Sequence, residues 1–333
     1  MADTSVAGVK PLPPRRTQAR LRLTPGDLQS NWYYVTTPRA LEDLRQHGDH
    51  ITYLVPFWYG VTQSGGLEDQ SDPVTKSLAG ERGIPIIAIV HNYASPEGSD
   101  LIHRLLTTPA LRSSLVRAIL VMLNREHYAG VNIDFQFVPP EDRGVLTEFV
   151  MELGRAISPL GYLLTLSVPA QLQDDPRHPF SGAFDYRALG ESAAYLYVLA
   201  YDEHFSAPGP IASTAFVRQA LDYAVDVVER RKIILGMAAY GYDWAGVGGT
   251  PVTLTHGAAV SLAERQGVPI VFDEEAGEPT FSYIRDGVRH IVWFENARSF
   301  AIKLDLARET NVAGIAVWRL GQEDPAIWTM IQH

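Results

Sequence analysis

The sequence predicts an α/β protein built on a (β/α)8 barrel (TIM barrel), with a small α+β insertion between the seventh strand and its helix. Short apolar runs alternate with amphipathic stretches of helix length, which is typical of parallel strands joined by helical crossovers. Polar and aromatic residues follow several of the apolar runs, and a barrel gathers such strand ends at one mouth. A doubly wound open sheet is the alternative architecture.

Eight strands and six helices describe the alternation along the chain. The strands are expected at residues 32–37, 51–61, 85–92, 130–137, 162–170, 194–202, 232–244 and 314–320. The helices are expected near residues 38–46, 71–82, 108–127, 141–158, 213–229 and 296–310. Eight strands spread over about 300 residues suit a closed barrel, whose active site lies at the carboxyl ends of the strands.

The chain divides into a leader and one large domain with an insertion. Residues 1–28 are rich in Pro and Arg and are expected to be a mobile leader, and residues 29–333 form the barrel. Residues 245–295 break the alternation and predict an α+β subdomain. Its helix is expected at 256–266 and its strands at 269–272, 280–285 and 288–294. Such an insertion raises one wall of the mouth and makes a groove suited to an extended ligand.

Composition excludes several classes of protein. With 46% hydrophobic and 20% charged residues the chain is an ordinary globular protein, and a net charge of -10 argues against nucleic acid as a partner. The absence of Cys rules out disulfides, thiolate nucleophiles and Cys-ligated metals. No apolar run is long enough to span a membrane or to form the core of a signal peptide.

The stretch 129–137, AGVNIDFQF, is the most informative segment. In a strand, Asn132, Asp134 and Gln136 face one side and the apolar residues between them face the other. Three polar side chains on a buried face are costly unless they serve chemistry or bond one another. The row therefore predicts a functional site. The alternative is a structural network in which Asn132 and Asp134 pair with each other and with Tyr201.

The segment AGVNIDFQ resembles the Asp-Gly-x-Asp-x-Asp-x-Glu signature of glycoside hydrolase family 18, and most of all its spore-germination and cortex-lytic branch. Ala129 replaces the first Asp of the signature, and Gln171 stands where related sequences often carry Lys. The likeness spans residues 30–331 in order and spacing. It continues through VPPEDR (138–143), SPLGYLLTLSVPA (158–170), LAYDEH (199–204), KIILGMAAYGYDW (232–244), GVRHIVWFENARS (287–299) and GIAVWRLG (314–321).

The resemblance implies retaining hydrolysis in which the substrate's own 2-acetamido group attacks the anomeric carbon. The implied substrates are N-acetylglucosamine-containing glycans, namely spore-cortex peptidoglycan or chitin. By the same resemblance, Asp134 orients the acetamide and stabilises the oxazolinium charge, and Tyr201 bonds the acetamide carbonyl. Asp202 supports the sugar, and Trp318 forms the floor of its subsite, although a core position is the alternative for this ring. Gln136 occupies the position of the proton donor.

Further expectations concern the groove, the partners and the location. Strand-end position adds five substrate-binding candidates, Phe57, Tyr59, Asn92, Tyr240 and Tyr242, and Asn132 of the motif is a sixth. No histidine pair has metal-ligand spacing and no Gly-rich loop suits a phosphate, so neither a metal nor a cofactor is expected. We expect a monomer that binds neither nucleic acid nor membranes. By resemblance, it is expected to be extracellular or associated with the spore or cell envelope.

Gln136 decides whether the expected activity survives. An amide cannot transfer a proton at ordinary pH, and the loss of a general acid costs about 10²–10⁴-fold in rate. Three explanations remain open: a natural loss that leaves a carbohydrate-binding pseudoenzyme, a deliberate Glu→Gln change, or a proton supplied by another carboxylate, with Glu203 nearest by motif. The expectation is a poorly active or inactive hydrolase, and the alternative is a non-catalytic carbohydrate-binding protein.

Overall fold

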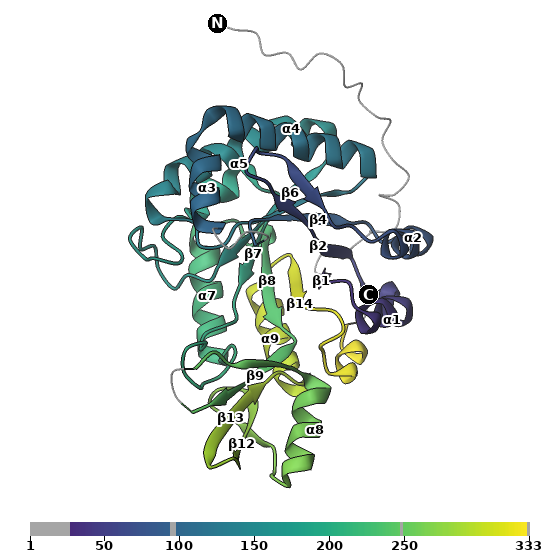
Figure 1. Ribbon diagram of the computed structural model, residues 1–333, viewed down its shortest axis with the longest axis vertical. Helices are drawn as coiled ribbons and strands as arrows, with labels where there is room; N and C mark the ends of the chain where they lie inside the picture. The colour runs from purple at the N-terminus through teal and green to yellow at the C-terminus, as the bar shows by residue number, and fades with distance from the viewer. Residues whose placement is uncertain (1–26, 94–97, 247–248, 332–333) are drawn as a thin grey trace, which may run out of the picture.

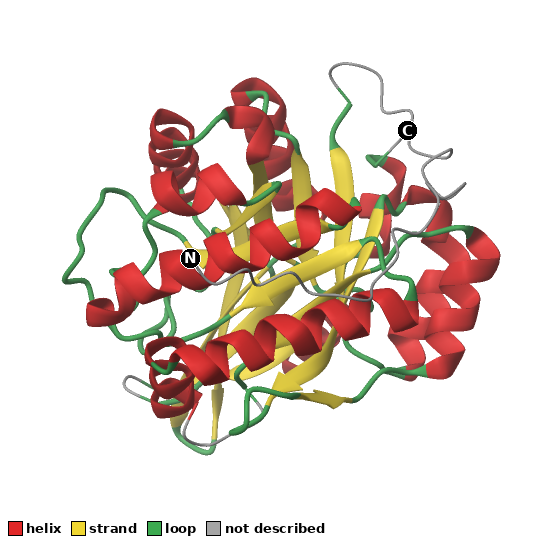
Figure 2. Cartoon of the chain, turned by 90° about the horizontal axis from the view of Figure 1, so that it is seen from above, coloured by secondary structure: helices red, strands yellow, loops and turns green. Residues whose placement is uncertain are grey.

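A closed barrel of parallel strands forms the body of the molecule. The computed structural model describes residues 27–93, 98–246 and 249–331. Within these residues the strands of the larger sheet follow the order β1-β14-β8-β7-β6-β5-β4-β2, and β1 also pairs with β2 to close the ring. Figure 2 shows the strands enclosed by helices. The predicted barrel is confirmed, and the alternative prediction of a doubly wound open sheet is wrong. Most of the expected leader lies outside the described residues.

The barrel elements follow one another as strand and helix (Figure 1). The strands are β1 (Gln29–Tyr34), β2 (Tyr53–Val61), β4 (Ile87–His91), β5 (Gly130–Asp134), β6 (Leu163–Pro169), β7 (Tyr195–Leu199), β8 (Ile233–Ala238) and β14 (Gly314–Trp318), and β3 (Leu67–Asp69) pairs antiparallel to β2. The helices are α1 (Pro38–His47), α2 (Pro73–Arg82), α3 (Gly98–Thr107), α4 (Pro109–Glu126), α5 (Arg143–Ile157), α6 (Tyr186–Ser192), α7 (Thr214–Val227) and α9 (Ala297–Thr310).

Local sequence explains where the helices begin. Thr37 and Asp72 precede α1 and α2, and each side chain accepts a hydrogen bond from the backbone N–H three residues on. Both helices have Pro at the next position, where a missing N–H costs nothing. Asn296 and Ser299 form a reciprocal capping box at the start of α9. These capping residues therefore set the positions at which the crossover helices begin.

Two predicted strands differ in the structure, and two of its helices were not expected. The strand expected over 232–244 is two strands, β8 in the barrel and β9 (Tyr240–Ala245) in a second sheet, because the Ala239 N–H bonds the carbonyl of Trp318 and the chain then leaves the barrel. Helices α3 and α6 were not expected. Strand β5 ends at Asp134 rather than at residue 137. In the described part of the chain no single helix is long and apolar enough to cross a membrane, and only the bent pair α3–α4 passes that test jointly.

The insertion between β8 and α9 is an antiparallel sheet with one helix. Its strand order is β10-β9-β13-β12-β11, and α8 packs on it through a small apolar cluster. It lies below the barrel in Figure 1. Its elements after β9 are β10 (Val252–Thr255), α8 (His256–Gln266), β11 (Val271–Asp273), β12 (Glu278–Arg285) and β13 (Val288–Phe294). The predicted α+β insertion is therefore present.

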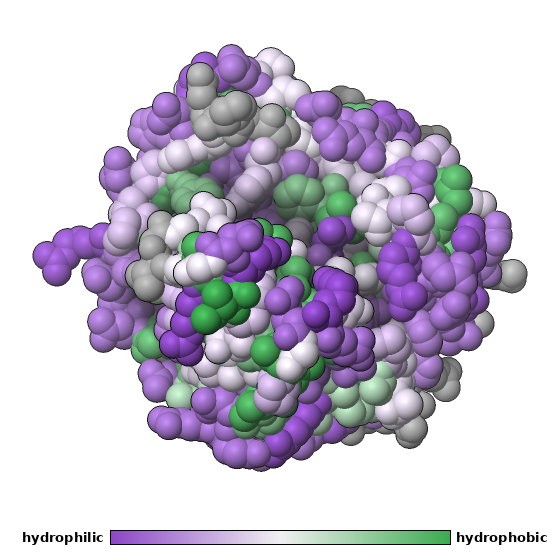
Figure 3. Space-filling model, turned by 60° about the horizontal axis from the view of Figure 1, so that its bottom comes forward, coloured by the Kyte–Doolittle hydropathy of each residue, from purple (hydrophilic) through white to green (hydrophobic). Residues whose placement is uncertain are grey.

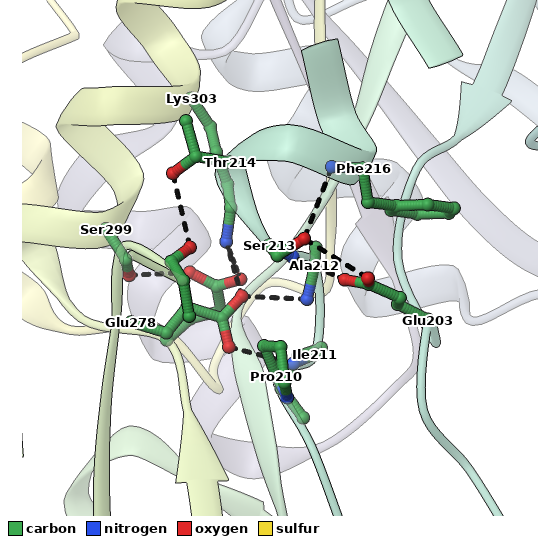
Figure 4. A network of polar contacts seen from close by, with 12 residues as sticks. Glu203, Pro210, Ile211, Ala212, Ser213, Thr214, Phe216, Glu278, Ser299 and Lys303 are labelled. Atoms are coloured by element: carbon green, nitrogen blue, oxygen red, sulfur yellow. Dashed lines mark hydrogen bonds and ion pairs between the residues drawn. The ribbon is translucent and has the colours of Figure 1, made fainter. Parts of the chain in front are cut away.

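A buried ionic cluster joins the insertion to the barrel (Figure 4). Glu278 of β12 is fully buried and accepts hydrogen bonds from the backbone N–H groups of Ile211 and Ala212, at 2.8 and 2.7 Å. Lys303 of α9 donates to Glu278 at 2.8 Å and also to Glu295, which follows β13. The cluster therefore ties together the loop after β7, the insertion and the last barrel helix.

Candidate active site

The carboxyl end of β5 carries the polar residues of the motif. Asn132 and Asp134 are buried within the strand, whereas Gln136 follows the strand and is half-buried. The amide nitrogen of Gln136 donates a hydrogen bond to the Asp134 carboxylate. The three polar side chains therefore lie on one side of the chain, although regular strand geometry ends at Asp134.

Asn92, which follows β4, holds the backbone of Gln136. Its side-chain oxygen accepts the Gln136 N–H at 2.9 Å, and its amide nitrogen donates to the Gln136 carbonyl at 2.7 Å and to the Gly98 carbonyl at 3.1 Å. The Asn92 side chain is buried and engaged with backbone on both sides, and its role as a substrate contact stays a prediction. Asn92 therefore fixes the position of the Gln136 backbone, from which the Gln136 side chain extends.

Asn132 belongs to a hydrogen-bonded network inside the barrel. Its amide nitrogen donates to Thr165 at 2.9 Å, and its oxygen accepts from Ser167 at 2.8 Å. The Ser167 hydroxyl lies 2.8 Å from the hydroxyl of Tyr33. Asn132 is fully buried, and its side chain bonds Thr165 and Ser167 rather than Asp134 or Tyr201. Its role as a sugar contact stays a prediction.

Burial makes the Asp134 carboxyl hard to ionise. Its pKa is raised to about 6 from an ordinary value of 3.8 by burial, and the hydrogen bond from Gln136 acts in the opposite direction. Burial, together with the Asp134 charge, also raises the pKa of Tyr33. A carboxyl that gains and loses its proton near neutral pH is suited to stabilise a positive charge that develops only during reaction.

The raised pKa predicts that Asp134 ionisation costs stability. The folded state holds this proton more tightly than the unfolded state, so stability that is fully present below pH 3.8 is lost as the pH rises through about 6. We expect Asp134→Asn to increase the free energy of unfolding by about 2–3 kcal/mol at pH 8 and to change it little near pH 4. Urea unfolding at both pH values measures the difference, and an equal effect at both would contradict the assignment.

Asp202 follows β7 and is braced by two tyrosines of β9. The Tyr242 hydroxyl donates to the Asp202 carboxylate at 2.7 Å, and the Tyr240 hydroxyl bonds the same oxygen. Asp202 has a left-handed backbone with φ of 57°, which is uncommon for a non-glycine residue. Both tyrosine rings are buried, and their hydroxyls hold the Asp202 carboxylate in place.

Tyr201 and Trp318 join two groups of aromatic rings. Both pack on the apolar cluster that contains Tyr240 and Tyr242, and the Tyr201 ring lies 6.3 Å from Tyr240. The ring of Trp318, the last residue of β14, lies 5.2 Å from Tyr33 in the barrel interior. Within the described residues the Tyr201 hydroxyl has no hydrogen-bond partner, and burial, with Tyr33 and Asp134 as further causes, raises its pKa. It is therefore available as a donor.

Phe57 and Tyr59 of β2 face opposite sides of the barrel wall. Phe57 stacks on His91 at 3.7 Å and lies 5.8 Å from Trp318, next to the other site residues. Tyr59 is 1% exposed, and its hydroxyl lies 3.0 Å from that of Tyr128, in the layer between barrel and helices. A register shift in β2 between Phe57 and Tyr59 separates the directions of the two side chains. The role of Tyr59 in the groove stays a prediction.

Glu203 is occupied by a structural role. Its carboxylate accepts hydrogen bonds from the Ser213 backbone N–H at 2.7 Å and the Ser213 hydroxyl at 3.1 Å, at the start of α7 (Figure 4). This geometry speaks against Glu203 as a substitute proton donor. In the described parts of the chain no group of three or more His, Asp or Glu side chains is arranged to hold a metal ion.

Comparison with known proteins identifies the family. The model for glycosyl hydrolases family 18 matches residues 92–323. The chain belongs to glycosyl hydrolase family 18. An uncharacterised glycosylase of Bacillus subtilis is 31% identical over 270 residues, which cover 78% of each chain. The cortical fragment-lytic enzyme of the same organism is 27% identical and covers 92% of this chain and 74% of the relative. The chain is therefore glycosidase-like, of the family 18 type.

Solved structures of family 18 members share the fold. A chitinase from Chromobacterium violaceum superposes with a TM-score of 0.84 at 31% identity, covering 92% of this chain and 98% of the other. The spore cortex-lytic enzyme of Bacillus megaterium gives a TM-score of 0.84 at 26% identity over 91% and 73% of the two chains. The resemblance found in the sequence motifs is thereby confirmed.

Proposed function

We propose that this family 18 protein binds N-acetylglucosamine-containing glycans in the site around Asp134. Asp134 orients the acetamide N–H of the bound sugar, the Tyr201 hydroxyl bonds the acetamide carbonyl, and Trp318 stacks on the apolar face of the ring. Asp202, braced by its two tyrosines, supports the same sugar. The observation that carries the proposal is the free Tyr201 hydroxyl beside a buried Asp134 carboxyl of raised pKa.

The chemistry available at this site is oxazoline formation without an enzymic acid. The acetamide carbonyl of the substrate attacks its own anomeric carbon, and the glycosidic oxygen must receive a proton as it leaves. Gln136 stands where that proton donor is required, and its amide instead donates a hydrogen bond to Asp134. We propose that polymer hydrolysis is therefore slow or absent while binding is retained.

The proposed ligand is spore-cortex peptidoglycan or chitin, the materials named for the relatives. We propose that the protein acts as a monomer at the spore or cell envelope, where such glycans lie. The net charge of -10 disfavours nucleic acid as a competing ligand.

The acetyl group is the chemical feature that tests the site. We expect N-acetylglucosamine oligomers to bind at least about tenfold more tightly than their de-N-acetylated counterparts. Removing the acetyl group takes away the contacts to Asp134 and Tyr201 and adds an ammonium group. Titration calorimetry with both ligands measures the ratio, with Tyr201→Phe as the matched variant, because it removes only the free hydroxyl. Equal affinities for the two ligands would show that no acetamide pocket operates.

A further inference from the structure

Arg319, which directly follows β14, is a partly buried cation without a partner. Within the described residues its guanidinium forms no hydrogen bond and no ion pair. Burial lowers the pKa of Arg319, and no neighbouring carboxylate acts in the opposite direction. Arginine stays charged in proteins, so this guanidinium has lost part of its hydration and has gained no counter-charge in return.

The other shielded cations of the protein are all partnered. In the described part of the chain, every other Lys or Arg side chain that is not exposed donates a hydrogen bond, namely those of Lys76, Arg82, Arg112, Arg143, Arg231, Lys232 and Lys303. Arg319 is the exception among them. A shielded polar group without a partner in the protein needs an explanation, and a ligand that supplies the partner is one.

The fold places Arg319 at the barrel mouth, next to Trp318, the proposed sugar floor. Its backbone is fixed on both sides, because the Trp318 carbonyl accepts a hydrogen bond from the Ala239 N–H at 2.7 Å and the Leu320 N–H donates to the Tyr33 carbonyl at 3.0 Å. The carboxyl ends of the strands face the insertion, since β8 leads into β9, and this face of the molecule is hollowed (Figure 3). The Arg319 side chain is therefore not needed to hold its own backbone.

We propose that Arg319 binds a carboxylate carried by the glycan, so that the site prefers the acidic glycan of peptidoglycan to neutral chitin. This inference rests on the proposed function. Peptidoglycan contains N-acetylmuramic acid, whose 3-O-lactyl group ends in a carboxylate where no peptide is attached, and a planar guanidinium can bond both oxygens of a carboxylate. Neither Asp134 nor Asp202 contributes to the pKa shift of Arg319. We therefore place the bound carboxylate on the sugar next to the one held at Asp134.

The charge of the ligand tests this inference. We expect the unchanged protein to bind an alternating tetrasaccharide of N-acetylglucosamine and N-acetylmuramic acid about tenfold more tightly than the same tetrasaccharide with its lactyl carboxyls amidated. Arg319→Gln should reduce this ratio to less than about twofold and should change the affinity for the amidated ligand less than about twofold. Added salt should weaken the acidic ligand more than the amidated one. Calorimetric titration measures both ligands on each protein.

A matched control separates recognition by Arg319 from a general effect of charge. Arg265→Gln removes an exposed arginine from the last turn of α8 and should leave the ratio unchanged. Urea unfolding should show that Arg319→Gln is at least as stable as the unchanged protein, because the substitution removes a charge without a partner.

Three results would refute the inference and leave the Asp134 site standing. The unchanged protein could bind the acidic and amidated ligands equally, Arg319→Gln could retain the preference, or Arg319→Gln could weaken both ligands alike, which would give the side chain a structural role. If neither ligand binds the unchanged protein, the proposed function itself fails, and the inference with it.

Discussion

Gln136→Glu is expected to raise the hydrolysis of N-acetylglucosamine polymers by at least about 10²-fold. The substitution restores a group that transfers a proton at the position where the leaving oxygen needs one. The side chains are nearly the same size, and the contacts of Asn92 to the Gln136 backbone do not depend on the side chain. The variant should therefore fold as the unchanged protein does.

The restored carboxyl should also give the rate a characteristic pH dependence. It would lie against Asp134, whose own pKa is already raised to about 6, and two adjacent buried carboxyls share a proton more readily than they both ionise. We expect the pair to hold one proton near neutral pH and kcat to fall on the alkaline side as that proton is lost. Initial rates on a soluble chitin oligomer across the pH range measure this limb.

A substrate with an acidic leaving group provides the control. A dinitrophenyl glycoside of an N-acetylglucosamine oligomer needs no protonation, so the unchanged protein should cleave it slowly and Asp134→Ala should not. If Gln136→Glu folds and binds the acetylated oligomer but cleaves neither substrate, the oxazoline chemistry is absent and the protein is a binding protein. Slow cleavage of the activated substrate alone identifies a hydrolase that lacks only its acid.

The barrel was predictable because its signals are local and repeated. Each strand is a short apolar run and each crossover is amphipathic. Because this strand-and-crossover pattern occurs eight times, the fold is predicted correctly even where the boundary of a single element is misplaced. Helix α3 was not expected, although its buried residues Leu101, Ile102, Leu105 and Leu106 lie at helical spacing. The split of 232–244 was not predictable from periodicity, because both halves are apolar strands and only their partners differ.

The site was predictable in part, for a physical reason. Asp134, Tyr201 and Trp318 follow strand ends, and barrel closure brings strand ends together. Strand-end position alone does not tell which face a side chain takes: Tyr59 lies in the outer layer, while Phe57 lies beside Trp318. The network partners Thr165 and Ser167 carried a usable signal, since two small polar residues spaced by two in an apolar strand face one side.

Removing the cation of the ionic cluster that joins the insertion to the barrel should destabilise the fold strongly, because the buried carboxylates are then left unpaired. Lys303 is 1% exposed and bonds two buried carboxylates, Glu278 and Glu295. Burial, with the adjacent Glu278 charge as the second cause, raises the pKa of Glu295 to about 8. Lys303→Met leaves these carboxyls without a counter-charge and should lower the free energy of unfolding by about 3–5 kcal/mol near neutral pH.

The pH dependence of that loss distinguishes a charge effect from lost packing. Without Lys303 the pKa of Glu295 rises further above that of the unfolded chain, so the variant regains stability as the pH falls and this carboxyl protonates. The deficit measured by urea unfolding should therefore be smaller near pH 5 than near pH 8. The same substitution at Lys76, whose ion pair with Glu126 is partly exposed, should cost no more than about 1 kcal/mol at either pH. A deficit for Lys303→Met that is the same at both pH values would mean that the lysine stem packs the joint and that its charge contributes little.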